Sequence, residues 1–299
     1  MLLITGITGH SGSYFLRHLI DNNYESPIRC TIRPNSNLSL LESSNLNIEK
    51  VICDLDDEFS LDNAMLGIDE VFHIGSIFYS KNVVKSALKN KVSRIICVHT
   101  TGIYSKFKSA SAEYKNIEFD IEKMIKRDKS SIQLIYLRPT MIYGYVGDRN
   151  MAIFIKMVDK IRLFPLIDYG KNLLQPVNGK DLGKAYFQLL INKNITSGDY
   201  ILSGKDAISM LDMMHTISNY LQKKTIFFNI PLGLGVILAK LFKLVTFNRF
   251  DFIERVQRMG EDRSFSHAEA TRDFGYDPMP FSEGLQNEVK QYLDNISHS

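Results

Sequence analysis

Three glycines near the N-terminus, Gly6, Gly9 and Gly12, follow a short apolar run and precede a segment with the one-sided apolar pattern of a helix. Glycine lets the chain turn tightly and lets main-chain N–H groups approach a ligand closely, and the start of a helix adds partial positive charge. A pyrophosphate group suits this arrangement. We therefore predict that this turn, including His10 and Ser11, binds a dinucleotide.

The residues that follow the second apolar run indicate which dinucleotide binds. Sites for NAD usually place a carboxylate here, where it holds the ribose 2′-hydroxyl. This sequence has Arg33 followed by Pro34 instead. A guanidinium forms bidentate, charge-assisted hydrogen bonds with a phosphate group. NADP is therefore the expected cofactor and NAD the alternative, in which case Arg33 is only an exposed loop residue.

The elements that position these residues alternate between strand-like and helix-like segments. Apolar runs with the length of strands occur at Leu2–Ile4, Cys30–Ile32, Val51–Cys53, Val71–Ile74, Ile95–Val98 and Leu134–Leu137. The runs are nearly continuous, as in parallel sheets that helices cover on both faces. The pattern predicts an α/β fold with a Rossmann-type, doubly wound parallel sheet.

The alternation stops near residue 145, where the segments become longer and mostly helical. We predict a dinucleotide-binding domain over residues 1–145 and a smaller, mostly helical substrate-binding region over 146–299. Asp181–Leu190 has the pattern of a helix. We expect this helix and the strand after it, near residues 178–202, to return to the sheet.

The composition is that of a globular protein, with 44% hydrophobic and 23% charged residues. The net charge of +3 is small and the basic residues are scattered, so no nucleic-acid partner is expected. Cys30, Cys53 and Cys97 lie in apolar runs and lack the spacing of a zinc site, which predicts buried thiols and no metal. No signal peptide opens the chain, so a cytoplasmic location is expected.

A stretch without charge covers residues 225–239. It is shorter than the roughly 20 residues that span a bilayer, so no transmembrane segment is expected. Asn229 and Pro231 interrupt the stretch, which predicts a loop followed by a helix packed against the protein. The alternative is a helix in the plane of a membrane surface, with Lys240 and Lys243 at the lipid headgroups.

Several further segments match one ordered pattern: Asp54-Leu55-Asp56, Val71 to Ser76, Thr100-Thr101, Arg138-Pro139-Thr140 and Phe274 to Pro278. With the glycine turn, they resemble the extended short-chain dehydrogenase/reductase family over nearly the whole chain. The resemblance implies that Asp54 and Leu55 contact adenine. It also implies that Gly75, Ser76, Thr100, Arg138 and Pro139 line the cofactor site, and that the chain can form a homodimer.

The catalytic centre of this family contains a hydroxyl residue and the motif Tyr-x-x-x-Lys on a helix. Thr101 and Tyr114 match the hydroxyl residue and the tyrosine, but Glu118 stands in the place of the lysine. A carboxylate there would favour the protonated tyrosine, which can donate a proton to an alkoxide but is a poor base. We therefore predict a catalytic site of Thr101, Tyr114 and Glu118, with Glu118 facing the ribose hydroxyls.

Two alternatives would restore a lysine to the site. Tyr104 and Lys108 also spell Tyr-x-x-x-Lys, although closer to the threonines than the family places it. Otherwise Lys106, Lys108 or Lys115 could reach the site from elsewhere, or all three could lie on a solvated surface.

The resemblance also points to residues that would contact a substrate. Phe78 and Tyr79 follow the fourth strand, and Asn150 and Gln175 lie in segments where family members touch a sugar nucleotide. Arg258 resembles the arginine that holds the diphosphate of such a substrate. Side-chain packing or surface exposure is the alternative for each of them.

Two functions follow from these expectations. The first is an NADP-dependent oxidoreductase acting on a nucleotide-activated sugar, with reduction of a keto-sugar favoured because epimerisation and dehydration begin with a base. The second is a non-catalytic NADP-sensing regulator or assembly subunit, since some atypical relatives lack the active-site motif. A lipid-surface enzyme for a polyprenyl-linked sugar is a third reading, suggested by the uncharged stretch.

Overall fold

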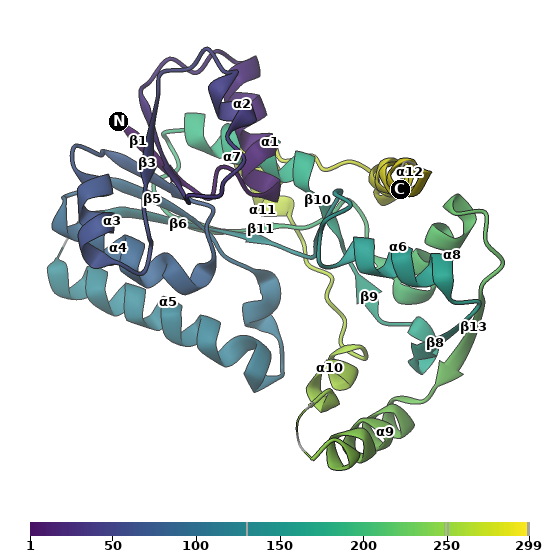
Figure 1. The fold of residues 1–299 in the computed structure, drawn as a ribbon. Helices are drawn as coiled ribbons and strands as arrows, with labels where there is room; N and C mark the ends of the chain where they lie inside the picture. The colour runs from purple at the N-terminus through teal and green to yellow at the C-terminus, as the bar shows by residue number, and fades with distance from the viewer. Residues whose placement is uncertain (130, 248, 250, 298–299) are drawn as a thin grey trace.

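A seven-stranded parallel sheet forms the centre of the computed structural model (Figure 1), which describes residues 1–129, 131–247, 249 and 251–297. The strand order is β11-β6-β5-β4-β1-β2-β3. The strands are β1 (Leu2–Thr5), β2 (Ile28–Ile32), β3 (Ile48–Ile52), β4 (Glu70–His73), β5 (Arg94–Val98), β6 (Gln133–Pro139) and β11 (Gly198–Leu202). The order reverses direction at β1, so the crevice beyond the carboxyl ends of β1 and β4 is the natural place for a ligand.

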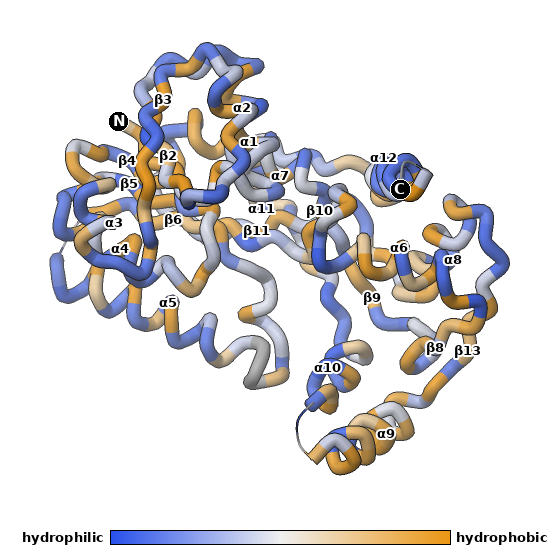
Figure 2. The backbone as a smooth tube through the Cα atoms, viewed as in Figure 1, coloured by the Kyte–Doolittle hydropathy of each residue, from blue (hydrophilic) through white to orange (hydrophobic). Residues whose placement is uncertain are grey.

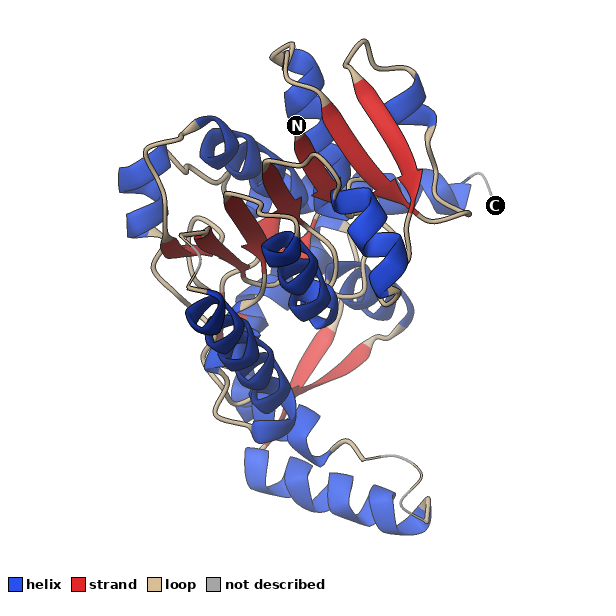
Figure 3. Ribbon diagram, turned by 90° about the vertical axis from the view of Figure 1, so that its left-hand side faces the viewer, coloured by secondary structure: helices blue, strands red, loops and turns tan. Residues whose placement is uncertain are grey.

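Helices cover both faces of the sheet (Figures 1 and 3). One core contains side chains of α1 (His10–Asp21), α7 (Gly179–Ile191) and α11 (Ala268–Phe274), with the short α2 (Ser39–Glu42) beside them. The other core contains side chains of α3 (Glu58–Met65), α4 (Ser80–Lys89) and α5 (Lys108–Asp128). The predicted Rossmann-type α/β fold is therefore confirmed.

The six predicted strands are all present, with ends shifted by a few residues. Cys30 and Cys97 lie in strands, whereas Cys53 follows β3 instead of ending it; all three are buried free thiols. The helix predicted over Asp181–Leu190 is α7, which packs on α1, and β11 pairs with β6 in the sheet.

A separate hydrophobic core lies in the C-terminal half of the chain. It is built from α6 (Met151–Lys160), α8 (Met210–Tyr220), α12 (Phe281–Ser297) and β8 (Leu163–Ile167). Two-stranded pairs join the segments around it: β7 (Ile142–Tyr143) with β10 (Val177–Asn178), β9 (Leu173–Leu174) with β12 (Ile208–Ser209), and β8 with β13 (Ile226–Ile230). Single 3-10 turns are η1 (Ile77–Tyr79), η2 (Thr101–Tyr104) and η3 (Asp168–Gly170).

The uncharged stretch folds differently from the prediction. Its first part is not a loop but β13, where Phe227 packs against Phe164 and His215. The following helix, α9 (Leu232–Val245), is not packed into the protein: only Gly235 and Ala239 are buried on it. Figure 2 shows α9 as an apolar segment at the edge of the molecule, beside α10 (Ile253–Arg258). None of the described helices is long and apolar enough to cross a membrane.

Candidate active site

The glycine turn lies between β1 and α1 and fits a pyrophosphate. A Cβ on Gly12 would stand 2.2 Å from the carbonyl oxygen of Gly6, and a Cβ on Gly6 would stand 2.8 Å from the nitrogen of Gly75. Gly6 also has a φ of +75°, which favours glycine. Gly9 is the N-cap of α1 and has no side chain to accept hydrogen bonds from the first turn, which contains no acidic residue. The first N–H groups of the helix therefore face an anion site.

The side chains of the first turn of α1 differ in what they offer to a ligand. The Nε2 atom of His10 is buried and has no hydrogen-bond partner among the described residues. Burial lowers the pKa of His10, so the ring is neutral near pH 7. Ser11 is turned toward the core, with its hydroxyl 3.4 Å from that of Tyr186. Ser11 can therefore serve a phosphate through its main-chain N–H.

His73 joins the glycine turn to the loop after β4. Its Nδ1 atom lies 2.6 Å from Oγ1 of Thr5, and its Nε2 atom lies 3.3 Å from the carbonyl oxygen of Ser76. Burial lowers the pKa of His73 to about 3, so the ring is neutral. A neutral ring must donate from Nε2 to Ser76 and accept at Nδ1 from Thr5, whose oxygen in turn accepts from the N–H of Gly75 (3.3 Å). This chain of hydrogen bonds fixes the backbone at Gly75 and Ser76 beside the turn.

The predicted adenosine contacts lie at the same edge of the sheet. Thr31 pairs with Thr5, so Arg33 begins the loop next to the glycine turn, and its side chain is exposed. Asp54 and Leu55 follow the neighbouring strand β3. The carbonyl oxygen of Leu55 accepts a hydrogen bond from Asn82 (3.0 Å), which holds this loop against α4.

The residues predicted for catalysis and for one wall of the pocket come from η2 and the start of α5. Oγ1 of Thr101 donates to the carbonyl oxygen of Pro139 (3.3 Å), and Oγ1 of Thr100 accepts from the N–H of Gly102 (3.0 Å). The ring of Tyr114 is half-buried beside Gly102, where a Cβ would stand 3.2 Å from the ring.

Phe78 and Tyr79 lie in η1, close to the tyrosine. The ring of Phe78 is exposed and its centre lies 5.8 Å from that of Tyr114, while Tyr79 is half-buried. Neither these two residues nor Tyr114 lines the cavity described below.

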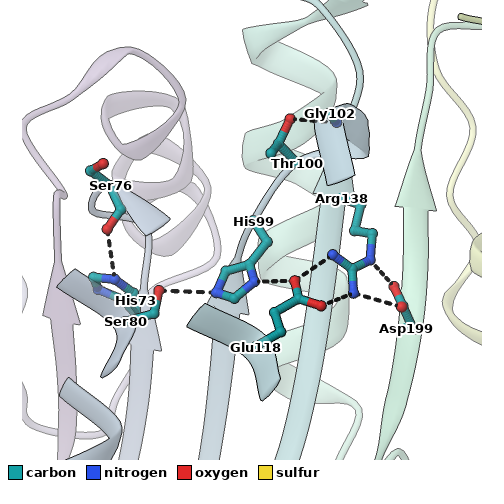
Figure 4. A network of polar contacts seen from close by, with 9 residues as sticks. All are labelled: His73, Ser76, Ser80, His99, Thr100, Gly102, Glu118, Arg138 and Asp199. Atoms are coloured by element: carbon teal, nitrogen blue, oxygen red, sulfur yellow. Dashed lines mark hydrogen bonds and ion pairs between the residues drawn. The ribbon is translucent and has the colours of Figure 1, made fainter. Parts of the chain in front are cut away.

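Glu118 has a different place from the one predicted (Figure 4). Its carboxylate is buried and receives two hydrogen bonds from the guanidinium of Arg138 (2.6 and 2.9 Å) and one from Nδ1 of His99 (2.7 Å). Arg138 also donates to Asp199 at 2.5 and 2.8 Å. The expectation that Glu118 faces the ribose as an uncompensated carboxylate is therefore wrong, because a buried cation on β6 already neutralises it.

The same contacts settle the charges in this network. Burial would raise the pKa of Glu118, but hydrogen bonds from His99 and Arg138 outweigh it and lower this pKa below its usual value. Burial lowers the pKa of His99, and the nearby Glu118 only partly offsets the effect. A neutral His99 donates from Nδ1 to Glu118 and accepts at Nε2 from the hydroxyl of Ser80 (2.9 Å). The guanidinium of Arg138, predicted to line the cofactor site, is committed to two carboxylates, so only the main chain of this segment is free for that role.

A cavity of about 440 Å³ extends from these elements to the C-terminal region. Thr100, Thr101 and Pro139 line it from segments next to the sheet, and Asn150, Gln175 and Arg258 line it from the C-terminal region. These predicted residues are therefore brought together.

The side chains of Gln175 and Asn150, which line the cavity, form different numbers of hydrogen bonds with the protein. The Gln175 amide donates to Gly204 O (2.8 Å) and accepts from Phe265 N–H (2.8 Å), so it shapes the cavity wall. Asn150 donates to the carbonyl oxygen of Ile142 (3.1 Å). Both side chains therefore form hydrogen bonds with main-chain groups of the protein.

The three lysines considered as substitutes for the family's catalytic lysine differ in where they lie relative to the cavity. Lys106 lines the cavity, and its main-chain N–H donates to Glu261 (2.8 Å). Lys115 is exposed on α5. The Lys108 side chain lies outside the described part of the structure.

Arg263 is a cavity residue that the sequence analysis missed. It lies five residues after Arg258, and the Nε atoms of both guanidinium groups are buried without a hydrogen-bond partner among the described residues. Burial and the neighbouring charge of Arg258 lower the pKa of Arg263. Two crowded, incompletely paired cations make a site for an anion with several oxygens. The spacing of two arginines in one short segment was the available signal.

Among the described residues, no group of three or more histidines, cysteines or carboxylates could hold a metal ion.

Comparisons with known proteins agree with this geometry. The model of the NmrA-like family matches residues 1–272. Dihydroflavonol 4-reductase of Arabidopsis thaliana is 23% identical over 347 aligned residues, covering 98% of this chain and 88% of the relative.

Solved structures match the whole chain. The crystal structure of gox2253 matches with a TM-score of 0.78 and 17% identity, covering 99% of this chain and 98% of that one. DesIV, a dTDP-glucose 4,6-dehydratase from Streptomyces venezuelae crystallised with NAD and TYD bound, matches with a TM-score of 0.72 and 17% identity over 99% of this chain and 98% of that one. At these identities the structures establish the fold. Because the family model covers residues 1–272, the chain belongs to the NmrA-like family, and its fold is that of the predicted extended short-chain dehydrogenase/reductase type.

Proposed function

The chain belongs to the NmrA-like family, and we propose that it is an NADP-dependent oxidoreductase that reduces a ketone on a nucleotide-activated sugar. Residues 1–145 hold the cofactor in this proposal, and residues 146–299 supply most of the substrate site. The observation that carries it is the pair of arginines, Arg258 and Arg263, which line the same cavity as Thr101.

The two arginines support the choice of substrate class. Their Nε atoms are buried and unpaired among the described residues, so a ligand that supplies acceptor oxygens removes an energetic cost. A diphosphate has such oxygens and a charge that offsets both cations. The structure of DesIV holds TYD, and that enzyme is named for dTDP-glucose, which supports a sugar nucleotide for this chain.

The side chains around Gly102 support reduction as the reaction. NADPH, when bound, supplies the hydride that converts a carbonyl carbon to an alcohol carbon. Thr101 lies on the cavity wall, where its hydroxyl can orient the carbonyl oxygen if it donates to the substrate in place of the carbonyl oxygen of Pro139. Tyr114 is the proton donor in this proposal, delivering the proton from its hydroxyl to the developing alkoxide. A neutral tyrosine serves this direction without a neighbouring lysine, and the relative from Arabidopsis is likewise named a reductase.

Oxidation of NADPH with a panel of keto-sugar nucleotides tests the proposal. We expect turnover with at least one of them, and a fall of about 100-fold or more in kcat for Tyr114→Phe, because a general acid contributes roughly 10²–10⁴-fold. Tyr169→Phe is a matched control, since that tyrosine is exposed and is not among the residues that line the cavity. Unchanged turnover in Tyr114→Phe would remove the tyrosine from the mechanism.

The substrate class has its own test. Arg263→Ala should raise the KM for a keto-sugar nucleotide about 10-fold or more while leaving the KM for NADPH unchanged. Equal KM values for the variant and the wild type would contradict the diphosphate site.

A second candidate function is a non-catalytic subunit that responds to NADP(H). The place of the family's lysine is occupied by Glu118, which is locked to Arg138 and His99. Tight binding of NADP(H) without turnover of any keto-sugar nucleotide would favour this candidate over the enzyme.

A further inference from the structure

The outward side of α9 is apolar along its whole length. Gly235 and Ala239 mark the inward side, and residues at helical spacing opposite them are exposed: Leu234, Ile237, Leu238, Leu241, Leu244 and Val245. We call these six residues the α9 face. Their exposed fractions range from 48% to 75%. An exposed apolar patch of this kind marks an interaction site.

The packing of α9 explains why this face stays uncovered. A Cβ on Gly235 would stand 2.8 Å from Ile167 and 3.1 Å from Val256, so the helix approaches β8 and α10 through its smallest residues. The six large side chains of the α9 face consequently stay exposed. In Figures 1 and 3, α9 extends from the end of the C-terminal region with α10 as its neighbour.

The charges around the α9 face identify its partner. Between Thr225 and Phe250 the sequence has three cations, Lys240, Lys243 and Arg249, and no acidic residue. The side chain of Lys240 is exposed at the border of the α9 face. Lys243 pairs with Asp251 (2.7 Å), beyond that segment. A surface that is apolar in the middle and basic at its border matches the acyl and headgroup layers of an anionic lipid leaflet.

The length of α9 excludes a transmembrane helix, and the sign of its charge argues against face-to-face pairing of two copies. At 1.5 Å per residue, its 14 residues are about 21 Å long, which is too short to cross the hydrocarbon core of roughly 30 Å. Face-to-face pairing of two copies would bring like charges together. A helix lying in the plane of the membrane avoids both problems.

We propose that α9 docks this protein onto anionic membrane surfaces, lying parallel to the bilayer with the α9 face among the acyl chains. The proposal does not depend on the reaction catalysed. It has a consequence for the site, because α10 packs against α9 and carries Arg258 of the cavity. Docking would bring that wall of the cavity close to the lipid surface.

Flotation of the full-length protein with vesicles tests the proposal. We expect the protein to float with vesicles of phosphatidylcholine and phosphatidylglycerol, and much less with phosphatidylcholine alone. The double variant Ile237→Glu, Leu241→Glu should lose at least about 10-fold in the floating fraction. The control Phe59→Glu replaces an even more exposed apolar residue on α3 and should float like the wild type. Calorimetric binding of NADPH to each variant shows that it is folded.

A fluorescent variant reports the depth of insertion directly. The chain contains no tryptophan, so Leu241→Trp introduces a single probe on the α9 face. Its emission should shift to the blue on addition of anionic vesicles, whereas that of Phe59→Trp should not. Wild-type protein that stays at the bottom of the gradient with both lipids would overturn the proposal. A second result would also overturn it. If light scattering showed that the wild type is a dimer and the double variant a monomer, and neither bound vesicles, a second copy of the chain would cover the α9 face.

Discussion

Arg33 is placed where a single residue can select between two cofactors. Thr31 pairs with Thr5 at the entrance to the glycine turn, and Arg33 starts the loop two residues later. A guanidinium can form charge-assisted hydrogen bonds with a phosphate on the adenosine ribose, whereas it adds little to the binding of a free ribose hydroxyl.

We expect Arg33→Ala to weaken the binding of NADPH about 10-fold or more and to leave the binding of NADH nearly unchanged. Charge-assisted hydrogen bonds contribute about 1.5–3 kcal/mol, which sets this magnitude. Calorimetric titration of both cofactors checks it, with Arg149→Ala as a control for the loss of an exposed positive charge. Equal losses for the two cofactors would show that Arg33 does not bind the 2′-phosphate.

Single residues could be predicted where the chemistry is local in sequence. The glycine turn is such a case, because its glycines, the strand before it and the helix after it are contiguous. Glu118 is the opposite case: its partners Arg138 and His99 lie 20 and 19 residues away on two other elements. Nothing in the sequence near Glu118 indicates that a cation neutralises it. Arg263 was missed for a similar reason, since only the folded structure places it in one cavity with Thr101.

At the scale of elements, the Glu118 carboxylate fastens α5 to the sheet. Arg138 comes from β6 and Asp199 from β11, so the network joins a helix to two strands that are adjacent in the sheet. Removing one member of a buried ion pair leaves the other charge in a poorly solvated place.

Glu118→Gln should lower the free energy of unfolding by about 3 kcal/mol, because breaking a buried pair costs roughly 3–5 kcal/mol and Asp199 still compensates part of the charge of Arg138. Glu118→Lys should be worse, since it buries a second cation beside Arg138. Urea unfolding measures both effects. Glu122→Gln, an exposed position one turn further along α5, should change stability by less than about 0.5 kcal/mol. A Glu118→Gln protein as stable as wild type would contradict the structural role.

The strands of the central sheet were predictable because buried parallel strands are continuous apolar runs. The structure of the segment that forms β13 and α9 was not predictable, because an apolar sequence does not indicate which other part of the protein packs against it. Phe227 on β13 packs against Phe164 and His215, whereas only Gly235 and Ala239 are buried on α9. Exposure of apolar side chains is a property of the assembled fold and leaves no local pattern.

At the scale of the whole molecule, Glu288 joins the C-terminal helix α12 to the loop that follows β7. The N–H of Gly144 donates to its Oε2 atom (2.6 Å), and the carboxyl group is completely buried. Burial, with the nearby charge of Asp148, raises the pKa of Glu288 to about 9. The folded protein therefore holds a proton that the unfolded chain releases above its ordinary pKa of about 4.5.

The sign of the pH dependence follows from that proton. Between pH of about 4.5 and 9 the folded state binds more protons than the unfolded state, so stability falls as the pH rises through this window. The slope contributed by one proton approaches about 1.4 kcal/mol per pH unit.

We expect urea unfolding between pH of about 6.5 and 8.5 to show a steeper loss of stability in the wild type than in Glu288→Gln, whose amide keeps an acceptor for Gly144 without titrating. Glu283→Gln, an exposed position on the same helix, serves as the control and should follow the wild type. Parallel pH profiles for the wild type and Glu288→Gln would mean that Glu288 is ionised in the folded protein.

The central claim is that the glycine turn at the start of α1 binds a nicotinamide dinucleotide. Isothermal titration calorimetry of the wild-type chain with NADPH and with NADH tests it most directly. We expect one site per chain and, under the proposed role of Arg33, tighter binding of NADPH than of NADH. The absence of binding heat from both cofactors would contradict it.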